Sequence, residues 1–142
     1  MKHERNKEKN LLKVNKKVLF NYEIKAEKEA GIVLQGWEVK AIKKKQFEFG
    51  ASYVFFTAKE AFLDNFFVSD TSINVKNTIK KRYKLLLHAT EIIRFQQLLK
   101  TQKGGTTVVP YKVYFNERRK IKVLLVVVVC LMMLMLVSVR SS

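Results

Sequence analysis

One uncharged segment constrains the fold of this chain more than any other. Residues 123–137 contain only Val, Leu, Cys and Met. A helix that spans a membrane needs about 20 apolar residues, with about 17 as a lower limit. Reading on across Ser138 to residue 139 brings the segment barely to that limit. Two structures therefore fit it: a short membrane anchor, or a last sheet strand that continues into an apolar tail with a risk of aggregation.

Composition points to a polyanionic partner. The 142 residues predict one domain and carry 28 Lys and Arg against 12 Asp and Glu, a formal net charge of +16. Such an excess is typical of proteins that bind nucleic acid or an anionic membrane surface. One cysteine, Cys130, excludes an intrachain disulfide, and with two histidines it offers no plausible zinc site. Since no acid, base or metal constellation is evident, we expect no enzyme activity, cofactor or small-molecule substrate.

The chain begins with a polar, mostly charged stretch. Residues 1–13 have no periodicity, and we expect a flexible basic arm there. The apolar residues at 18–20, followed by Tyr22 and Ile24, predict the first strand. Lys16 and Lys17 precede it. They are either phosphate-binding cations or part of an ordinary solvated segment, and these alternatives are about even.

Two aromatic and β-branched segments predict a hairpin. Residues 47–56 and 61–68 flank a polar break of hairpin length at residues 57–60. Apolar side chains occupy both parities of each segment, which predicts a sheet covered on both faces, as in a small barrel with a helix packed on it. The rings could instead form a base-stacking platform. We favour core packing, because no basic residue is interleaved with the rings in this hairpin.

The strongest local candidate for nucleic-acid binding is a basic cluster at residues 76–84. Its cations are Lys76, Lys80, Lys81, Arg82 and Lys84, with Tyr83 among them. Several cations and one aromatic ring within nine residues suit phosphate binding, the alternative being a solvated loop.

A helix and two strands are predicted after this cluster. His88 stands three residues before Glu91, the spacing of a helix-capping box, and Gly104 and Gly105 end the helical region. His88 is therefore a helix cap or, alternatively, an exposed RNA contact. Residues 106–115 predict a strand that has an edge position or a bulge at Pro110. A turn at residues 116–117 leads into a return strand.

Residues 29–40 have the sequence EAGIVLQGWEVK. Residues 32–34 predict a buried strand, Gly36 ends it, and residues 37–42 fit one or two helical turns before the lysines at 43–45. From the residues alone we favour a tight strand-to-helix turn without function. The alternative is an RNA-facing corner that presents Lys40 and the lysines after it.

The same segment resembles the signature of the SsrA-binding protein (SmpB) family, the partner of transfer-messenger RNA. Further motifs of that family follow in order at residues 52–54, 60–63, 84–88, 91–92 and 105–115, so that the resemblance covers residues 15–125. It implies a mainly β fold: a small antiparallel β-barrel of the oligonucleotide-binding type with two or three packed helices. It also implies a cytoplasmic, non-enzymatic factor that binds the tRNA-like domain of transfer-messenger RNA and delivers it to stalled ribosomes for nascent-chain tagging and ribosome rescue. We expect a monomer.

The resemblance also implies individual RNA contacts. The family's RNA-binding positions fall on Glu29, Leu86 and His88, and a carboxylate suits such a site if it accepts hydrogen bonds from base or ribose donors. Tyr83 stands where the family usually has arginine. The implied phosphate contacts are Lys81, Arg82 and Lys84.

The C-terminus departs from the family pattern. Where the family has a Gly-Lys-Lys-x-x-Asp-Lys-Arg segment and a basic tail for the ribosomal decoding site, residues 127–130 are Val-Val-Val-Cys. We therefore predict an arm at residues 1–13, an RNA-binding barrel at 14–125 and an atypical apolar tail at 126–142. The leading interpretation is a frame-shifted or degenerate terminus. The second is an anchor, which would make the protein a basic domain tethered to a membrane.

Overall fold

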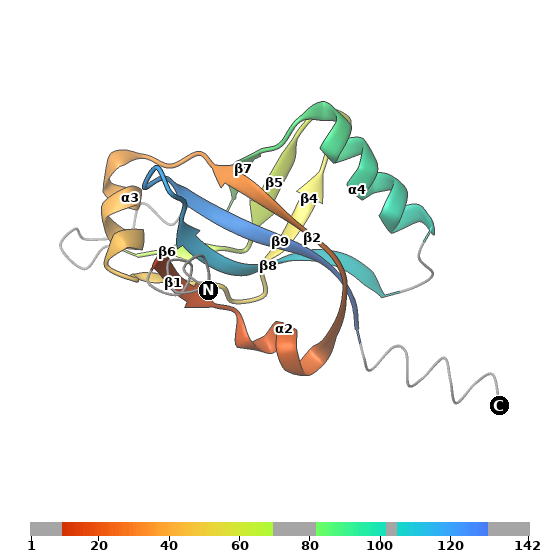
Figure 1. The fold of residues 1–142 in the computed structure, drawn as a ribbon, viewed down its shortest axis with the longest axis horizontal. Helices are drawn as coiled ribbons and strands as arrows, with labels where there is room; N and C mark the ends of the chain where they lie inside the picture. Colours follow the sequence, from red (N-terminus) through yellow and green to blue (C-terminus); the bar gives the residue numbers. More distant parts are fainter. Residues whose placement is uncertain (1–9, 70–81, 102–104, 131–142) are drawn as a thin grey trace.

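The computed structural model describes residues 10–69, 82–101 and 105–130. Figure 1 shows a β-rich domain with helices on its outside. The strands are β1 (Leu11–Val14), β2 (Tyr22–Ile32), β3 (Phe47–Glu48), β4 (Tyr53–Phe56), β5 (Ala61–Asp64), β6 (Phe67–Val68), β7 (Tyr83–Leu86), β8 (Thr106–Phe115) and β9 (Ile121–Cys130). The helices are α2 (Lys16–Asn21), α3 (Gly36–Lys43) and α4 (Ala89–Thr101).

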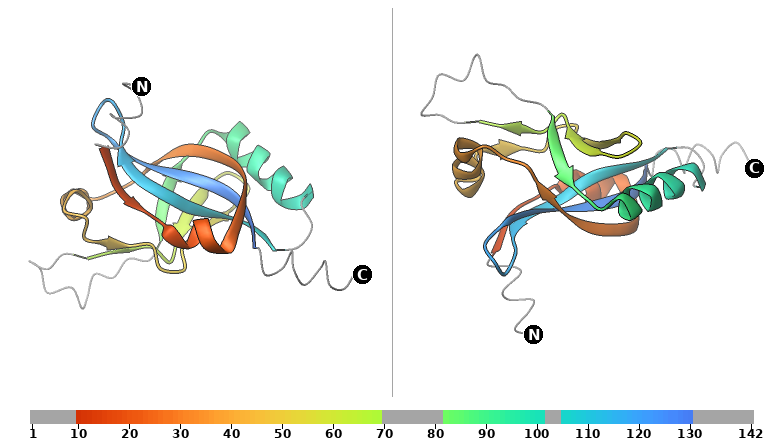
Figure 2. Two further views of the ribbon diagram at one scale, coloured as in Figure 1. Left: turned by 60° about the horizontal axis from the view of Figure 1, so that its bottom comes forward. Right: turned by 90° about the horizontal axis from the view of Figure 1, so that it is seen from above.

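Seven strands form one antiparallel sheet in the order β1-β8-β9-β2-β7-β5-β4, and β3 pairs with β6. The sheet curls far enough that β4 contacts β8, and the two views in Figure 2 show this curvature. The interior is apolar, and its largest fully buried side chains include Tyr83, Phe47 and Phe66. The predicted mainly β barrel with packed helices is confirmed.

The uncharged segment begins inside the sheet. Strand β9 runs to Cys130 and pairs with β2 on one side and β8 on the other. Val123, Leu125 and Val127 belong to the main core, whereas Val126 and Val128 pack with Val18 of α2. The run is therefore buried on both faces of the sheet as far as Val129, past the boundary expected at residue 125. Residues 131–142 lie outside the described part of the chain. Within the described part, no helix is long and apolar enough to cross a membrane.

The predicted first strand was wrong at residues 18–20, because this segment belongs to helix α2, whereas Tyr22 and Ile24 lie in strand β2 as predicted. The backbone N–H of Asn15 donates to the carbonyl of Tyr111 at 2.7 Å, and its side-chain amide donates to the carbonyl of Pro110 at 2.9 Å. These bonds fix the start of the helix on β8. Val18 then turns fully into the second apolar cluster, while Phe20 stays 76% exposed.

The predicted hairpin is confirmed as β4 and β5. The Thr57 N–H donates to the Glu60 carbonyl at 2.9 Å, so the polar break is the turn. Each flanking segment is interrupted by a residue with positive φ, Gly50 at 53° and Asn65 at 56°, and these bends separate β3 and β6 from the hairpin. At Pro110 the β8–β9 register shifts, which confirms the bulge rather than an edge.

The segment of residues 29–40 forms the end of β2, a short connection and α3. Only Ile32 of the expected buried strand 32–34 lies in β2, and Val33 is 44% exposed, so that expectation was wrong in part. Helix α3 begins at Gly36 as predicted. Its N-terminus is a capping box in which Glu38 accepts from the Gln35 N–H at 2.7 Å. Burial of Ala41 and Ile42 fixes the helix on the core.

Candidate nucleic-acid interface

An open depression lies on the outer face of the sheet where β7, β2 and β9 run side by side. Gly31 of β2 pairs with Leu86 of β7 on one side and with Lys122 of β9 on the other. Directly paired residues of antiparallel strands share a face of the sheet, so these two side chains flank the glycine. A Cβ at position 31 would lie 3.2 Å from Leu86 Cδ1 and 3.4 Å from Lys122 Nζ. The missing side chain therefore keeps the depression open.

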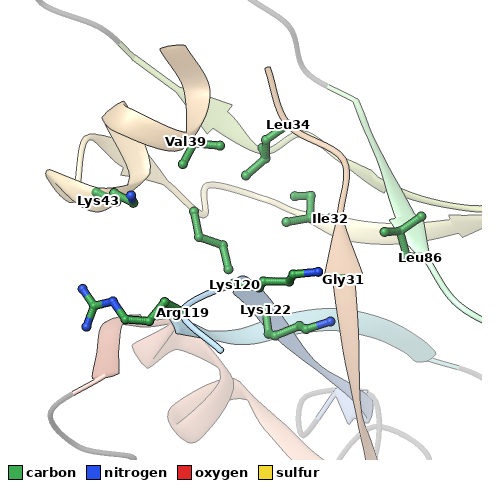
Figure 3. Close-up of a pocket in the computed structure, with 10 residues that line it drawn as sticks. Gly31, Ile32, Leu34, Val39, Lys43, Leu86, Arg119, Lys120 and Lys122 are labelled. Atoms are coloured by element: carbon green, nitrogen blue, oxygen red, sulfur yellow. The ribbon is translucent and has the colours of Figure 1, made fainter. Parts of the chain in front are cut away.

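Helix α3 and the β8–β9 turn complete this depression as a pocket of ≈ 320 Å³, which we call the Gly31 pocket (Figure 3). Its apolar lining is Ile32, Leu34, Val39, Leu86 and Ile121. Its cations are Lys43, Arg119, Lys120 and Lys122. The corner after β2 thus presents an apolar floor beside positive charge, which suits a sugar or base together with its phosphate.

The cations of the Gly31 pocket are free to meet a phosphate. Among the described residues, Lys43, Lys120 and Lys122 have no carboxylate within ion-pair distance. The guanidinium group of Arg119 lies 5.3 Å from the centre of the Phe115 ring. Because these lysines form no ion pair among the described residues, their charge remains available to a phosphate.

Glu29 lies beside the pocket on the exposed part of β2. It pairs with Leu124 of β9, and the hydroxyl of Tyr114 on β8 donates a hydrogen bond to Glu29 Oε2. Burial and the neighbouring Glu29 carboxylate raise the pKa of the Tyr114 phenol, which keeps it protonated as a donor. The carboxylate is thereby held in one orientation. Its remaining lone pairs can accept from base or ribose donors.

The predicted basic cluster divides in two. Lys76, Lys80 and Lys81 lie outside the described residues. Arg82, directly before β7, and Lys84, on the outer face of β7, are exposed but form ion pairs with Asp64 at 3.0 Å and with Glu60 at 3.3 Å. Their local charge is therefore largely balanced.

Tyr83, expected inside the basic cluster, is instead fully buried, so that expectation was wrong. The reason is strand alternation, because β7 sends every second side chain inward. Burial, with the adjacent buried Glu38 carboxylate, raises the pKa of the Tyr83 phenol. Tyr83 therefore serves the core rather than an RNA surface.

His88 is exposed at the start of α4. Its backbone N–H donates to Glu91 Oε1 at 2.9 Å, which confirms the Glu91 half of the predicted capping box. Glu91 also pairs with Lys28 of β2 at 2.9 Å. Leu86, which is 56% exposed, lies two residues before His88 at the edge of the Gly31 pocket.

The other predicted contacts are spread over the surface. Lys40 is exposed on α3, the helix that also supplies Lys43 to the pocket. Lys16 and Lys17 are exposed on α2, which precedes β2 and so lies at the opposite end of that strand from Gly31. The structure therefore brings Glu29, Leu86 and the α3 corner together and leaves α2 apart.

Sequence reasoning missed three cationic lining residues of the pocket, Arg119, Lys120 and Lys122, and it included Lys43 only in the alternative of an RNA-facing corner. The alternation of Lys120 and Lys122 on one side of the return strand was visible in the sequence. What was not visible is that the β8–β9 turn meets α3 in space. No group of three metal-ligating side chains occurs within the described ranges.

A small antiparallel barrel with an open cationic pocket on its outer face defines a nucleic-acid-binding domain. The SmpB protein family model matches residues 12–130. The SsrA-binding protein of Malacoplasma penetrans is 43% identical over 115 residues, which cover 80% of this chain and 77% of the relative. That of Thermus thermophilus is 37% identical over 113 residues, covering 78% and 77%. This chain belongs to the SmpB family.

A solved structure agrees with this placement. A chain described as "tmRNA-SmpB: a journey to the center of the bacterial ribosome" is 37% identical and superposes with a TM-score of 0.61. The match covers 76% of each chain.

Proposed function

We propose that this protein binds the tRNA-like domain of transfer-messenger RNA through the Gly31 pocket and Glu29, and delivers it to stalled ribosomes for nascent-chain tagging and ribosome rescue. The observation that carries the proposal is the open depression at Gly31, where Leu86 and four cations line one pocket and Glu29 precedes Gly31 by two residues on the same strand. Membership of the SmpB family supports the choice of RNA. The similar chain from a tmRNA-SmpB study of the ribosome supports the second partner.

The geometry suggests how the RNA is held. The cations at the rim neutralise phosphates, and the release of counterions makes binding dependent on salt. The apolar floor formed by Ile32 and Leu86 accommodates a ribose or base face. Glu29 accepts hydrogen bonds from a base or a ribose hydroxyl, because an ionised phosphate has no hydrogen-bond donor. The protein acts by binding in the cytoplasm, without catalysing a reaction.

Titration of the tRNA-like domain with the full chain tests the proposal. Lys120→Ala and Lys122→Ala should each weaken binding several-fold at low salt and reduce the slope of log K against log salt by about one unit. Lys59→Ala, in the exposed β4–β5 turn, is the charge-removal control because it removes one charge from a side chain that does not line the pocket. Equal effects of all three variants would show that only overall charge matters and would reject the pocket.

A further inference from the structure

The aromatic run of β4 is divided between the core and the surface. Val54 is buried, whereas Tyr53 and Phe55 point to the other face of the strand and are 37% and 40% exposed. The prediction of core packing therefore holds for only part of this run. Phe55 pairs with Phe62 of β5, so the two rings share the outer face.

A guanidinium group lies on these rings. The guanidinium group of Arg82, the residue directly before β7, is 5.0 Å from the ring centre of Phe55 and 5.7 Å from that of Phe62. Asp64 Oδ2 accepts from Arg82 Nη2 at 3.0 Å and from the Tyr53 hydroxyl at 3.2 Å. The hydrogen bond from Arg82 lowers the pKa of the Asp64 carboxyl group, so Arg82 and Asp64 form an ion pair at neutral pH.

The guanidinium group of Arg82 remains accessible to a ligand although it is paired with Asp64. The Arg82 side chain is 52% exposed although its charge is paired with Asp64. A fixed guanidinium plane over aromatic rings is a preorganised surface for stacking rather than a mobile phosphate contact. The sequence of the hairpin has no basic residue among its rings, but Arg82, directly before the neighbouring strand β7, supplies one.

This surface is continuous with the Gly31 pocket. Lys84 and Leu86 point outward from β7, Arg82 is exposed directly before this strand, and Leu86 lines the pocket. Lys84 pairs with Phe62 across the β5–β7 ladder. One exposed face of the barrel therefore carries both features, joined by a single strand.

We propose that Tyr53, Phe55, Phe62 and Arg82 form a stacking platform for an unpaired base of the same RNA that occupies the Gly31 pocket. This inference rests on the proposed function. Aromatic rings and arginine planes are the groups on which splayed-out RNA bases stack. Since Asp64 balances Arg82, the platform contributes stacking and adds little to the salt dependence of binding.

The full chain and the isolated tRNA-like domain provide the test. Phe55→Leu retains an apolar side chain without a π face, and Arg82→Lys retains the charge without the plane. Each should weaken binding about tenfold and leave the salt slope unchanged, because each removes a stacking contact and no charge. Lys59→Ala in the same hairpin is the charge control. Ultraviolet crosslinking should join an unpaired nucleotide to Tyr53 or Phe55. Circular dichroism verifies that each variant is folded.

The outcomes separate this inference from the proposed function. If both platform variants bind like the wild type while Gly31→Leu abolishes binding, the platform is wrong and the pocket stands. A reduced salt slope in Arg82→Lys or Phe55→Leu would also overturn stacking, because it would indicate phosphate contacts. If the wild type does not bind the RNA, the proposed function fails and the platform fails with it.

Discussion

The hydroxyl of Tyr114 on β8 donates a hydrogen bond to the carboxylate of Glu29 on β2, across the intervening strand β9. The two residues are 85 positions apart in the sequence and meet only in the folded sheet. The contact fixes an acidic side chain next to the cations of the Gly31 pocket. It therefore links the orientation of the proposed RNA acceptor to the pairing of three strands.

Tyr114→Phe should weaken binding of the tRNA-like domain a few-fold, because the carboxylate loses its fixed orientation while the sheet stays intact. Glu29→Gln should weaken it more. The double variant should resemble Glu29→Gln, since residues that act as one unit are not additive. Fluorescence titration of the four proteins gives the coupling energy, and strictly additive losses would contradict a positioning role for Tyr114.

Substitution of Gly31 should separate stability from binding. Gly31→Ala places a Cβ 3.3 Å from Leu86 Cβ and should cost about 1 kcal/mol of unfolding free energy through overpacking. Gly31→Leu fills the pocket and should abolish RNA binding. Urea denaturation and RNA titration measure the two effects. Full RNA affinity in a folded Gly31→Leu protein would show that the depression is not the binding site.

Tyr83→Phe should destabilise the fold by about 1–3 kcal/mol, because the buried Glu38 carboxylate loses a neighbouring hydroxyl. The Tyr83 pKa is raised in the folded state, so its contribution is fully present below the unfolded pKa of about 10 and is lost as the pH rises further. Denaturant midpoints between pH 7 and 11 should thus fall less steeply in Tyr83→Phe than in the wild type. Parallel curves would refute this assignment.

The Glu91 contacts predict a paired result. Glu91→Gln can still accept from the His88 N–H but loses the ion pair with Lys28, whereas Glu91→Ala loses both and should cost about 1 kcal/mol. The hydrogen bond from Lys28, followed by that from His88, lowers the Glu91 pKa. Its stabilisation is therefore full above about pH 4.5 and is lost as the pH falls. Thermal unfolding between pH 2 and 7 should show the three proteins converging at the acidic end.

The C-terminal departure can be tested with two chimeras in a stalled-ribosome tagging assay. A family-type basic tail fused after Cys130 should raise the tagging yield above that of the natural chain, while both proteins should bind the RNA equally well. The same tail fused directly after Val123 removes most of β9 and should yield an unfolded protein. Equal tagging yields for the natural chain and the Cys130 fusion would show that the basic tail is not needed, and a folded Val123 fusion would contradict the central place of β9.

Local signals made part of the fold predictable. The β4–β5 hairpin is encoded by two aromatic segments around a polar turn, and α4 by the spacing of His88 and Glu91. Helix α2 could not be predicted in this way. A helix of six residues is too short to show a periodic pattern. Its start depends on the hydrogen bond from the Asn15 side chain to the carbonyl of Pro110, 95 positions away.

The candidate site was less accessible to sequence reasoning. The resemblance identified Glu29, Leu86 and His88, but neither spacing nor charge could group them with Lys43 and Arg119. Those two residues join the pocket because α3 and the β8–β9 turn meet in the folded barrel. Likewise, Arg82 sits among the rings of the hairpin only through the β5–β7 pairing.

Strand β9, the last described strand to leave the ribosome, occupies an interior place in the sheet between β8 and β2. Until it has been synthesised, β2 and β8 expose unpaired strand edges, and Val18 of α2 and Val109 of β8 lack the β9 valines that cover them. The nascent barrel therefore cannot close progressively from its N-terminus. It must fold in a late step that joins early and late segments of the chain, and a message broken within this strand would release an open, aggregation-prone sheet.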